Sequence, residues 1–571
     1  MRVAVISPHL DEPLPDEPDR GGVEVTEPVP VIWLSLHEGI DARGPWDTAI
    51  LERLFDGDEW GHGIEFEHFD VVYYMPKATN ERCVVVLPAR HHCSADDIAE
   101  INQILGVMDS VLLILCGDEE GKFPWKDIRH PNILFWVQMP DPDHYADMHD
   151  YGFFFGNGAP LIDDTMNEKT SSYFFSGQAT NPRRKAAFDG LRRMRRASGN
   201  LQMTDGFARG FERAEYLGKM DRAWMAPAPS GPRSVDTFRA YEALEQGCVP
   251  LVDRATPSGV NHYWEFVYAE VPFPIIEDWE IVGGIIEDMF PYRHLMSARC
   301  SAWWQQRKRE MTWRLRHDLA KLGVDVPEQK VTAIITTSPS PHHPTLRIIQ
   351  ETIASVRHHF GDIEIIIACD GVRPEQEHLR ERYETYLYDL CRWVEHRTSN
   401  IVVYIAETWR HQAMLTFEAL TQLGCNEVLL FLEHDTPLII DETIDVEKAI
   451  ETIDMGMLDV LRFHHEAYVL QPHEYLMVDH QTIDLAGLPV RRTRQFSQRP
   501  HLAGRDYYLT VLGTHFTRES RTMIEDKMHS VCQSNPWSKN RIAIYHPDTG
   551  NIKRSAHLDG RGDESKFEMV Y

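Results

Sequence analysis

The chain is 571 residues long and acidic, with 58 Lys and Arg against 88 Asp and Glu and a formal net charge of −30 at pH 7. At roughly 150 residues per domain, this length predicts three to four folding units. Apolar residues make up 43% and charged residues 26%, which excludes the disordered and fibrous classes. The excess of acids opposes a general polyanion-binding surface, because non-specific nucleic-acid affinity comes largely from Lys and Arg contacts to phosphate.

The sequence shows no feature of a membrane or secreted protein. No apolar run approaches the roughly 18 residues that a membrane span needs. The first apolar run, 3–6, is followed at once by His9, Asp11 and Glu12, which is not the pattern of a secretory signal. The nine cysteines lack CxxC pairing, which argues against a disulfide scaffold or a cysteine-built zinc site. We therefore expect no membrane span and a cytoplasmic location.

After an irregular, proline-rich lead-in at 10–30, short apolar runs alternate with helical stretches. The runs are continuous rather than alternating, which is typical of strands buried on both faces of a parallel sheet. They form two series, which predict two Rossmann-like α/β units at 1–150 and 151–325. The expected strands are 31–34, 71–74, 83–87, 111–115 and 133–137 in the first unit, and 173–175, 223–225 and 249–252 in the second.

A long tryptophan-bearing helix, expected at 296–322, precedes a polar boundary at 323–329. The strand and helix pattern then restarts, which predicts a third α/β unit at 330–571. We expect a chain beginning near residue 328 to fold and to bind a nucleotide sugar by itself. The expected strands of this unit are 331–336, 363–369, 401–405 and 427–432.

An acid pair follows the last of these strands. Glu433 and Asp435 come directly after five apolar residues, 428–432. Residues two apart in an extended chain point the same way, so the two carboxylates can converge at the carboxyl end of the strand. Oxygen ligands there suit a hard divalent ion that carries diphosphate, and that edge is where α/β sheets bind ligands. The alternative interpretation is an acidic turn after a strand.

The order of strands around this pair resembles the GT-A fold of family 2 glycosyltransferases, over roughly 330–560. The resemblance implies that Asp370, which follows the strand 363–369, contacts the nucleotide base or ribose of a nucleotide-sugar donor. It also implies that Glu433-His434-Asp435 stands for the family's DxD motif, which binds Mn²⁺ or Mg²⁺ and the donor diphosphate. Glu433 departs from that motif, since it keeps the charge of the first Asp but has a longer reach.

An inverting transfer also needs a carboxylate that takes the proton of the acceptor hydroxyl. Two acids after the motif, Glu466 and Asp506, are candidates for this base, and the pattern does not choose between them. A late histidine often completes the metal site in this family, and His515 and His557 are the candidates here. With 29 histidines in the chain, a structural role is the alternative for each.

The first half carries a second motif, in which a loop at 226–231 leads to a helix expected at 236–246. Arg239 and Glu242 lie one turn apart on this helix, which suits a diphosphate and ribose hydroxyls respectively, although a surface ion pair is the alternative. Together with the run 247–252, the string resembles the exostosin-like (GT47) glycosyltransferases of GT-B architecture. The resemblance implies that Arg239, Glu242 and, more weakly, Arg183 contact the donor, without a bound metal.

The two resemblances together predict a tandem nucleotide-sugar-dependent glycosyltransferase, a hexosyl- or pentosyltransferase with two modules. Its acceptor would be a hydroxyl of a glycan, a protein or a hydroxymethylated DNA base. The alternative is a carbohydrate- or nucleotide-binding protein in which one or both modules are inactive. Two arginine-rich clusters, 183–196 and 491–505, are either nucleic-acid contacts, with Phe496, His501, Tyr507 and Tyr508 stacking on bases, or solvated surface charge.

Overall fold

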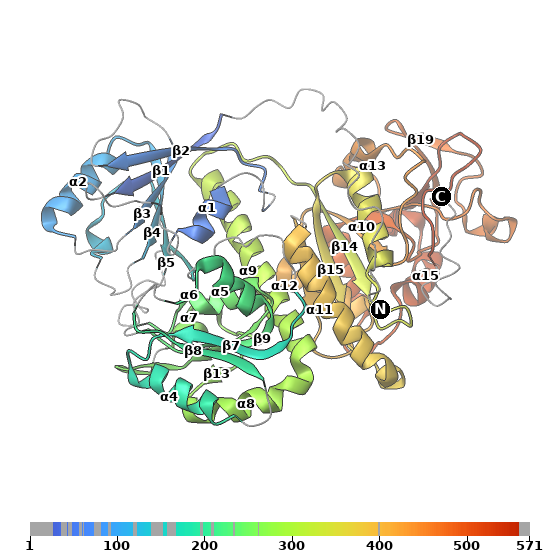
Figure 1. Ribbon diagram of the computed structural model, residues 1–571. Helices are drawn as coiled ribbons and strands as arrows, with labels where there is room; N and C mark the ends of the chain where they lie inside the picture. Colours follow the sequence, from blue (N-terminus) through green and yellow to red (C-terminus); the bar gives the residue numbers. More distant parts are fainter. Residues whose placement is uncertain are drawn as a thin grey trace.

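The structure is a computed structural model of α/β class, as the sequence predicts (Figure 1). Three sheets, each flanked by helices, account for most of the described chain, and a two-stranded ribbon is formed by β11 (Ala255–Thr256) and β12 (Gly259–Val260). The model describes residues 27–35, 43, 48–55, 60, 62–72, 82–88, 93–117, 123–138, 152–156, 167–194, 198–206, 210–231, 234–260, 262–397 and 400–558.

The first sheet has six parallel strands in the order β2-β1-β3-β4-β5-β6. Its central strand β4 is buried along its whole length, which explains why its sequence is apolar without alternation. The strands are β1 (Val29–Ser35), β2 (Phe66–Val72), β3 (Arg82–Pro88), β4 (Ser110–Cys116), β5 (Ile133–Gln138) and β6 (Gly152–Phe155), with helices α1 (Ala49–Phe55) and α2 (Ala95–Leu105).

The second sheet is also parallel, in the order β13-β10-β9-β7-β8. Its core strands β7, β9 and β10 lie where the sequence predicts strands. The strands are β7 (Ser171–Gly177), β8 (Gly199–Met203), β9 (Ala223–Ala228), β10 (Val249–Asp253) and β13 (Ile275–Ile276). The helices are α4 (Pro182–Arg192), α5 (Arg213–Asp221), α6 (Phe238–Glu245), α7 (Tyr263–Tyr268) and α8 (Val282–Met289).

The third sheet has nine strands in the order β16-β15-β14-β17-β21-β18-β22-β20-β19. The first four are parallel, and β21 runs antiparallel between β17 and β18. The strands are β14 (Val331–Thr337), β15 (Glu364–Cys369), β16 (Ile401–Ile405), β17 (Val428–Glu433), β18 (Val460–Arg462), β19 (Ile483–Leu485), β20 (Leu488–Thr493), β21 (His501–Gly504) and β22 (Ile542–Tyr545). The helices are α10 (Arg347–Phe360), α11 (Arg380–Arg397), α12 (Gln412–Leu423), α13 (Val446–Asp454), α14 (Arg505–His515) and α15 (Ile524–Ser534).

Helix α9 (Arg293–Lys321) joins the second and third sheets and packs against both (Figure 1). On one side it contacts α6 and β10, and on the other α11 and β16. Buried charges tie the same region together. Glu245 of α6 pairs with Arg53 of α1 at 2.9 Å and lies 3.5 Å from Lys308 of α9, which also pairs with Glu395 of α11. The three α/β units therefore meet in one ionic network.

The packing of α9 argues against the expectation that a chain beginning near residue 328 folds by itself. Arg309 Nε and Trp313 Nε1 of α9 lie 2.5 and 3.0 Å from Glu364 Oε1, and Glu364 is buried at the start of β15. Without α9 this carboxylate would lose these two partners and keep the hydrogen bond from Thr332 Oγ1. The division at 1–150, 151–325 and 330–571 stays a proposal, in which α9 belongs to the folding unit of the third sheet as well as the second. Within the described ranges, no helix is both long and apolar enough to cross a membrane.

Candidate functional site

The predicted acids gather at the carboxyl edge of the third sheet. Strand β14 lies between β15 and β17, and its register pairs Thr336 with Glu433 and Thr337 with Cys369. Asp370 therefore leaves the sheet close to the level at which Glu433 does. Parallel strands place their carboxyl ends at one edge, which is the edge where α/β proteins bind ligands.

A short segment, 555–558, brings His557 to Asp435. Ser555 pairs with Leu438, and the N–H of Leu558 donates to the carbonyl of Asp435 at 2.7 Å. The segment is fixed on its other side as well, because Ser555 Oγ donates to the carbonyl of Phe463 at 2.9 Å. As a result, His557 Nε2 lies 3.5 Å from Asp435 Oδ2.

The two side chains stabilise each other's charged forms. The hydrogen bond to Asp435 raises the pKa of His557 although partial burial opposes it. Burial acts to raise the pKa of Asp435, but His434 and His557 outweigh burial, and the pKa is lowered. Each side chain therefore favours the charged form of the other, with the imidazole about half exposed and the carboxylate mostly covered.

Glu433 has a different environment from Asp435. Burial, together with the charge of Asp435, raises its pKa to about 7. Its Oε1 accepts a hydrogen bond from Gln412 Nε2 at 2.9 Å, and Gln412 Oε1 accepts from Gln498 Nε2 at 2.7 Å. This amide chain, which the sequence did not indicate, fixes the carboxylate of Glu433 on the side of α12.

Asp370 organises the loop that precedes α12. Its Oδ1 accepts from the N–H groups of Gly371 and Arg410 at 2.8 and 2.7 Å, and its Oδ2 from that of His411 at 3.0 Å. Burial nevertheless raises its pKa to about 6. Gly371 is required here, since a Cβ would lie 2.3 Å from the nitrogen of Trp409. The donor contact expected of Asp370 stays a prediction, because its oxygens already bind backbone.

Glu466 lies beyond the end of β18, which runs parallel to β17 through the intervening β21. Its Oε1 is 3.6 Å from His465 Nε2, and its side chain is 45% exposed. Arg499 reaches the same region, because its charge acts on both Glu433 and His557. Sequence reasoning placed Arg499 only in a basic cluster and missed its proximity to the acids.

The structure does not bring the other two candidates to this edge. Gly504 pairs with Val428 at the start of β17, and the N–H of Arg505 donates to the carbonyl of Glu427. Asp506 therefore lies at the amino edge of the sheet, about 20 Å along the strand from Glu433. It is also 86% exposed and pairs with Arg505. We therefore withdraw Asp506 as a candidate base.

His515 ends α14, where its carbonyl accepts a hydrogen bond from Lys527 of α15. Among the described residues, no contact of His515 reaches Glu433, Asp435 or His557. The structure thus assigns the position beside Asp435 to His557, and we withdraw His515 from the candidate metal ligands.

The described residues contain no cluster of three or more His, Cys, Asp or Glu that could by itself hold a metal ion. Asp435 and His557 offer two donors whose 3.5 Å separation is compatible with neighbouring positions around one cation. Mg²⁺ commonly uses one or two carboxylates and takes its remaining ligands from substrate phosphates and water. The donor set therefore fits a cation that arrives with a diphosphate, and does not fit a cation held by protein alone.

In the second unit, Arg239 and Glu242 share a partner. Tyr216 of α5 donates to Glu242 Oε2 at 3.0 Å, and Arg239 Nε lies 3.3 Å from the same hydroxyl. Arg239 Nη2 also donates to the carbonyl of Ser176 at 2.6 Å, at the carboxyl end of β7. Burial raises the pKa of Glu242 although Arg239 opposes it. The two residues lie at the ligand edge of the second sheet but are not a surface ion pair.

Arg183 is engaged inside the second unit. Its Nε donates to Asp253 Oδ2 at 2.9 Å, its Nη2 pairs with Oδ1, and the same Nη2 donates to the carbonyl of Glu277. Asp253 is fully buried at the end of β10. These bonds hold α4 against β10, so the structure explains Arg183 without a ligand, and its donor contact stays a prediction.

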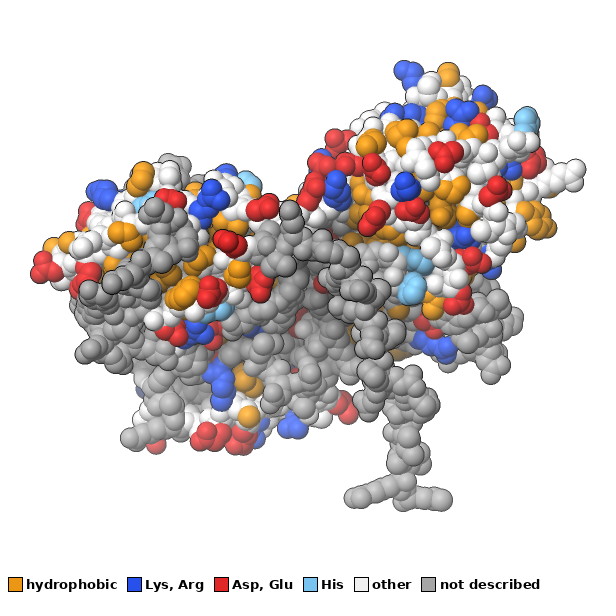
Figure 2. Space-filling model, turned by 90° about the horizontal axis from the view of Figure 1, so that it is seen from above, with side chains coloured by type: hydrophobic (Ala, Val, Ile, Leu, Met, Phe, Trp, Pro, Cys, Tyr) orange, Lys and Arg blue, Asp and Glu red, His pale blue; other side chains and the backbone are white. Residues whose placement is uncertain are grey.

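The two arginine-rich clusters do not form basic surfaces in the part of the chain that the structure describes. Arg491, Arg492 and Arg193 each pair with an acid, and Arg195 and Arg196 lie outside the described residues. Phe496, His501 and Tyr508 are buried and cannot stack on bases. On the face in Figure 2, Lys and Arg side chains are scattered among acids. The structure thus gives no support to a nucleic-acid contact at these clusters.

No protein-family model and no curated protein matches the chain, so neither motif resemblance is confirmed at the family level. Solved structures are similar over part of it. TarS of S. aureus in complex with UDP-GlcNAc is 16% identical, with 42% of this chain and 62% of that one covered and a TM-score of 0.26. GalNAc-T7 with UDP, GalNAc and Mn²⁺ is 11% identical, with coverage of 42% and 46% and a TM-score of 0.27.

An apo UDP-glucose pyrophosphorylase is 10% identical, with 41% of this chain and 94% of that one covered and a TM-score of 0.25. The chain spans less than two thirds of the TarS and GalNAc-T7 chains that it matches. At such TM-scores these similarities do not bear on activity, which is argued below from the residues themselves.

Proposed function

We propose that the third α/β unit is a nucleotide-sugar-dependent glycosyltransferase. The observation that carries the proposal is the convergence of Asp435, His557 and Glu433 at the carboxyl edge of one sheet, although His557 comes from a distant segment, with Glu466 beyond the end of β18 at the same edge. Such convergence is expected of a site and not of an acidic turn. The transferred group would be a hexose or pentose, and the acceptor a hydroxyl of a glycan, a protein or a modified base.

In this proposal, Asp435 and His557 hold the divalent cation that arrives with the donor, and the cation stabilises the negative charge of the departing diphosphate. Arg499 adds positive charge on the side of Glu433. Gln412 Nε2 donates a hydrogen bond to Glu433 Oε1, and Glu433 lies near enough to Asp435 to be affected by its charge. Burial and the charge of Asp435 raise the pKa of Glu433 to about 7, and a cation at Asp435 would lower it again, so the metal contact expected of Glu433 stays a prediction.

Glu466 is the acid best placed to act on the acceptor. It is the only one of the two sequence candidates at this edge, and its exposed carboxylate is accessible from solvent. As the acceptor oxygen bonds to the anomeric carbon and the bond to the diphosphate oxygen breaks, Glu466 would take the acceptor proton.

The proposal is tested by incubating the full chain with a panel of nucleotide sugars and Mn²⁺ and measuring release of the free nucleotide. We expect release with at least one donor and its loss in Asp435→Asn, with Asp506→Asn as the matched acid-to-amide control. Binding of a donor without release, in the presence of candidate acceptors, would instead favour the alternative of an inactive carbohydrate- or nucleotide-binding module.

A second candidate function concerns the second unit, which we propose binds a nucleotide sugar without metal. Support comes from the start of α6, where Ser230 Oγ and Thr237 Oγ1 are buried and have no hydrogen-bond partner among the described residues. A helix N-terminus with such hydroxyls and Arg239 suits a diphosphate. Arg239→Ala should weaken donor binding roughly 10- to 100-fold in calorimetry with EDTA present. Unchanged affinity would leave this unit as a scaffold.

A further inference from the structure

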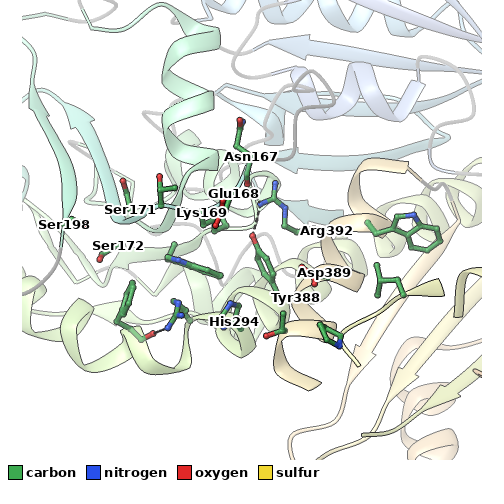
Figure 3. A pocket seen from close by; sticks show the side chains of 18 residues that line it. Asn167, Glu168, Lys169, Ser171, Ser172, Ser198, His294, Tyr388, Asp389 and Arg392 are labelled. Atoms are coloured by element: carbon green, nitrogen blue, oxygen red, sulfur yellow. Dashed lines mark hydrogen bonds between the residues drawn. The ribbon is translucent and has the colours of Figure 1, made fainter. Parts of the chain in front are cut away.

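A cavity of about 790 Å³ lies at the junction of the second and third units, between the amino edge of the second sheet and the loop that follows β14 (Figure 3). One wall is the amino edge of the second sheet, where Ser171 and Ser172 begin β7 and Trp224 lies in β9. The opposite wall is α11, with Thr385, Tyr388, Asp389 and Arg392. Arg293 and His294, at the start of α9, close it between the two walls. We call this space the junction pocket.

The cations that line the junction pocket are largely neutralised by protein. Arg392 Nη2 pairs with the buried Asp221 Oδ1 at 2.7 Å. Lys169 Nζ donates to the carbonyls of Asp221, Ala223 and Gln246 at 3.1, 2.6 and 3.0 Å. The remaining cation is Arg293, and its positive charge is balanced by the carboxylates of Asp389 and Glu168 on the same lining. With charges that cancel, the pocket gains little from a strongly anionic ligand.

Hydrogen-bonding groups of both kinds remain available. Arg392 is 5% exposed and its Nε has no partner among the described residues, which leaves a buried donor unsatisfied. Asp389 makes no hydrogen bond in the described chain, and burial raises its pKa to about 6 although Arg392 opposes the shift. The hydroxyl of Ser172 can both donate and accept, and Ser171 Oγ, which accepts from Asn200 Nδ2 at 3.4 Å, keeps its proton to donate. Thr385 Oγ1 donates to the carbonyl of Glu381 at 3.0 Å and can still accept.

The lining also carries aromatic side chains. The rings of Trp224 and Tyr388 contact each other at a centroid distance of 5.0 Å, with His294 against the edge of Trp224 at 4.6 Å. Phe290 and Trp393 line the pocket as well and are partly exposed. Aromatic surface combined with paired donors and acceptors matches a ligand whose rings carry C–H faces and whose rims carry hydroxyls.

We propose that the junction pocket binds a neutral oligosaccharide. Its volume falls within the range of about 300 to 1,000 Å³ of small-molecule sites. Each sugar hydroxyl is a donor and an acceptor, which suits the carboxylate of Asp389, the Nε of Arg392 and the serine hydroxyls together. A nucleotide sugar fits less well, since its diphosphate would meet no unpaired cluster of cations.

The position of the junction pocket indicates that the oligosaccharide it binds is the glycan acceptor. This inference rests on the proposed function. Pro344 and Leu346 of the pocket belong to the loop between β14 and α10, which also carries His342 and His343. The ring of His342 stacks on His434 at 5.5 Å, next to Asp435. A chain held in the pocket would therefore lie beside the loop that borders the proposed transfer site.

The test is calorimetry of the full chain with cellotetraose, maltotetraose and chitotetraose, with a heparin-derived tetrasaccharide as the anionic comparison. We expect binding of at least one neutral tetrasaccharide in preference to the anionic one. Two variants fill the pocket from opposite walls, Ser171→Trp and Thr385→Trp, and each should weaken binding at least about tenfold. His358→Trp adds the same ring at an exposed position of α10, outside the pocket, and should bind like the wild type.

Absence of binding by all three neutral tetrasaccharides would overturn the proposal, as would preference for the anionic one. Binding that survives both filling variants, with folding verified by circular dichroism, would also overturn it. Asp435→Asn separates this proposal from the proposed transferase activity, because it should abolish nucleotide release and leave tetrasaccharide binding unchanged. Binding in a chain that turns over no donor would support the pocket and reject the transferase.

Discussion

Asp435, in the middle of the third unit, and His557, near its end, meet with 3.5 Å between Oδ2 and Nε2. Two backbone pairings create this contact, because Ser555 bridges to Leu438 and Leu558 donates to the carbonyl of Asp435. The segment 555–558 is in turn anchored to the end of β18 through the carbonyls of Phe463 and His464. The contact is therefore built into the fold and does not depend on the two side chains alone.

The first prediction concerns this pair. Asp435→Asn should lower nucleotide release at least about 100-fold with little change in stability, because the carboxylate is at the sheet edge and not in the core. His557→Ala should instead weaken the apparent affinity for Mn²⁺ about tenfold or more and be partly rescued by higher Mn²⁺. Full activity in excess EDTA would reject a metal role for both residues.

The second prediction separates the two acids that the sequence could not rank. Glu466→Gln should lower kcat by about 10²- to 10⁴-fold with donor KM little changed, since general-base catalysis acts on the transition state. Asp506→Asn is the matched control and should behave like the wild type, because Asp506 lies at the amino edge of the sheet. Equal losses in both variants would mean that Glu466 acts through stability and not through catalysis.

The outcome for these residues shows what a linear pattern can and cannot indicate. Glu433 and Asp435 were predicted because they follow a buried apolar strand at the edge where parallel strands end, and Asp370 was predicted from the family resemblance. Asp506 and His557 could not be placed in this way. Their positions depend on β21 running antiparallel and on a single bridge at Ser555, and neither feature has a local sequence signature.

The strands also differ in how well the sequence predicts them. The buried central strands β4, β14 and β17 lie where continuous apolar runs predict them. The edge strand β8 was missed, because its sequence, GNLQM, has no continuous apolar run, is largely exposed, and forms a strand only by pairing with β7. The junction pocket could not be predicted from the sequence either, because its walls come from segments that meet only when α9 packs on both units.

The third prediction uses the role of α9. A chain of residues 328–571 should fail to unfold cooperatively, because removal of α9 takes Arg309 and Trp313 away from Glu364 and uncovers β16. A chain of residues 291–571, which keeps α9, should show a cooperative transition. Chemical denaturation followed by circular dichroism compares the two, and equal stability would reject a shared helix.

The last prediction concerns stability at acid pH and rests on His501. The imidazole is fully buried in β21, with its ring 5.1 Å from that of Phe431 and Nδ1 within 2.7 Å of the carbonyl of Arg499. Burial, with Arg462 nearby, lowers its pKa to about 4. The unfolded chain binds a proton at this residue below about pH 6.5 and the folded chain does not until about pH 4, so the unfolded state holds more protons between these values.

The free energy of unfolding should therefore fall as the pH drops from 6.5 to 4, by up to about 1.4 kcal/mol per pH unit from His501. His501→Phe removes the titrating group and keeps a ring in the aromatic cluster, so its stability should fall less steeply over this range. Phe496→Leu, in the same cluster, is the control, because it lowers stability by a similar amount at every pH. Urea denaturation at pH 4.5, 5.5, 6.5 and 7.5 measures the slopes, and equal slopes for His501→Phe and the wild type would show that His501 does not contribute to acid sensitivity.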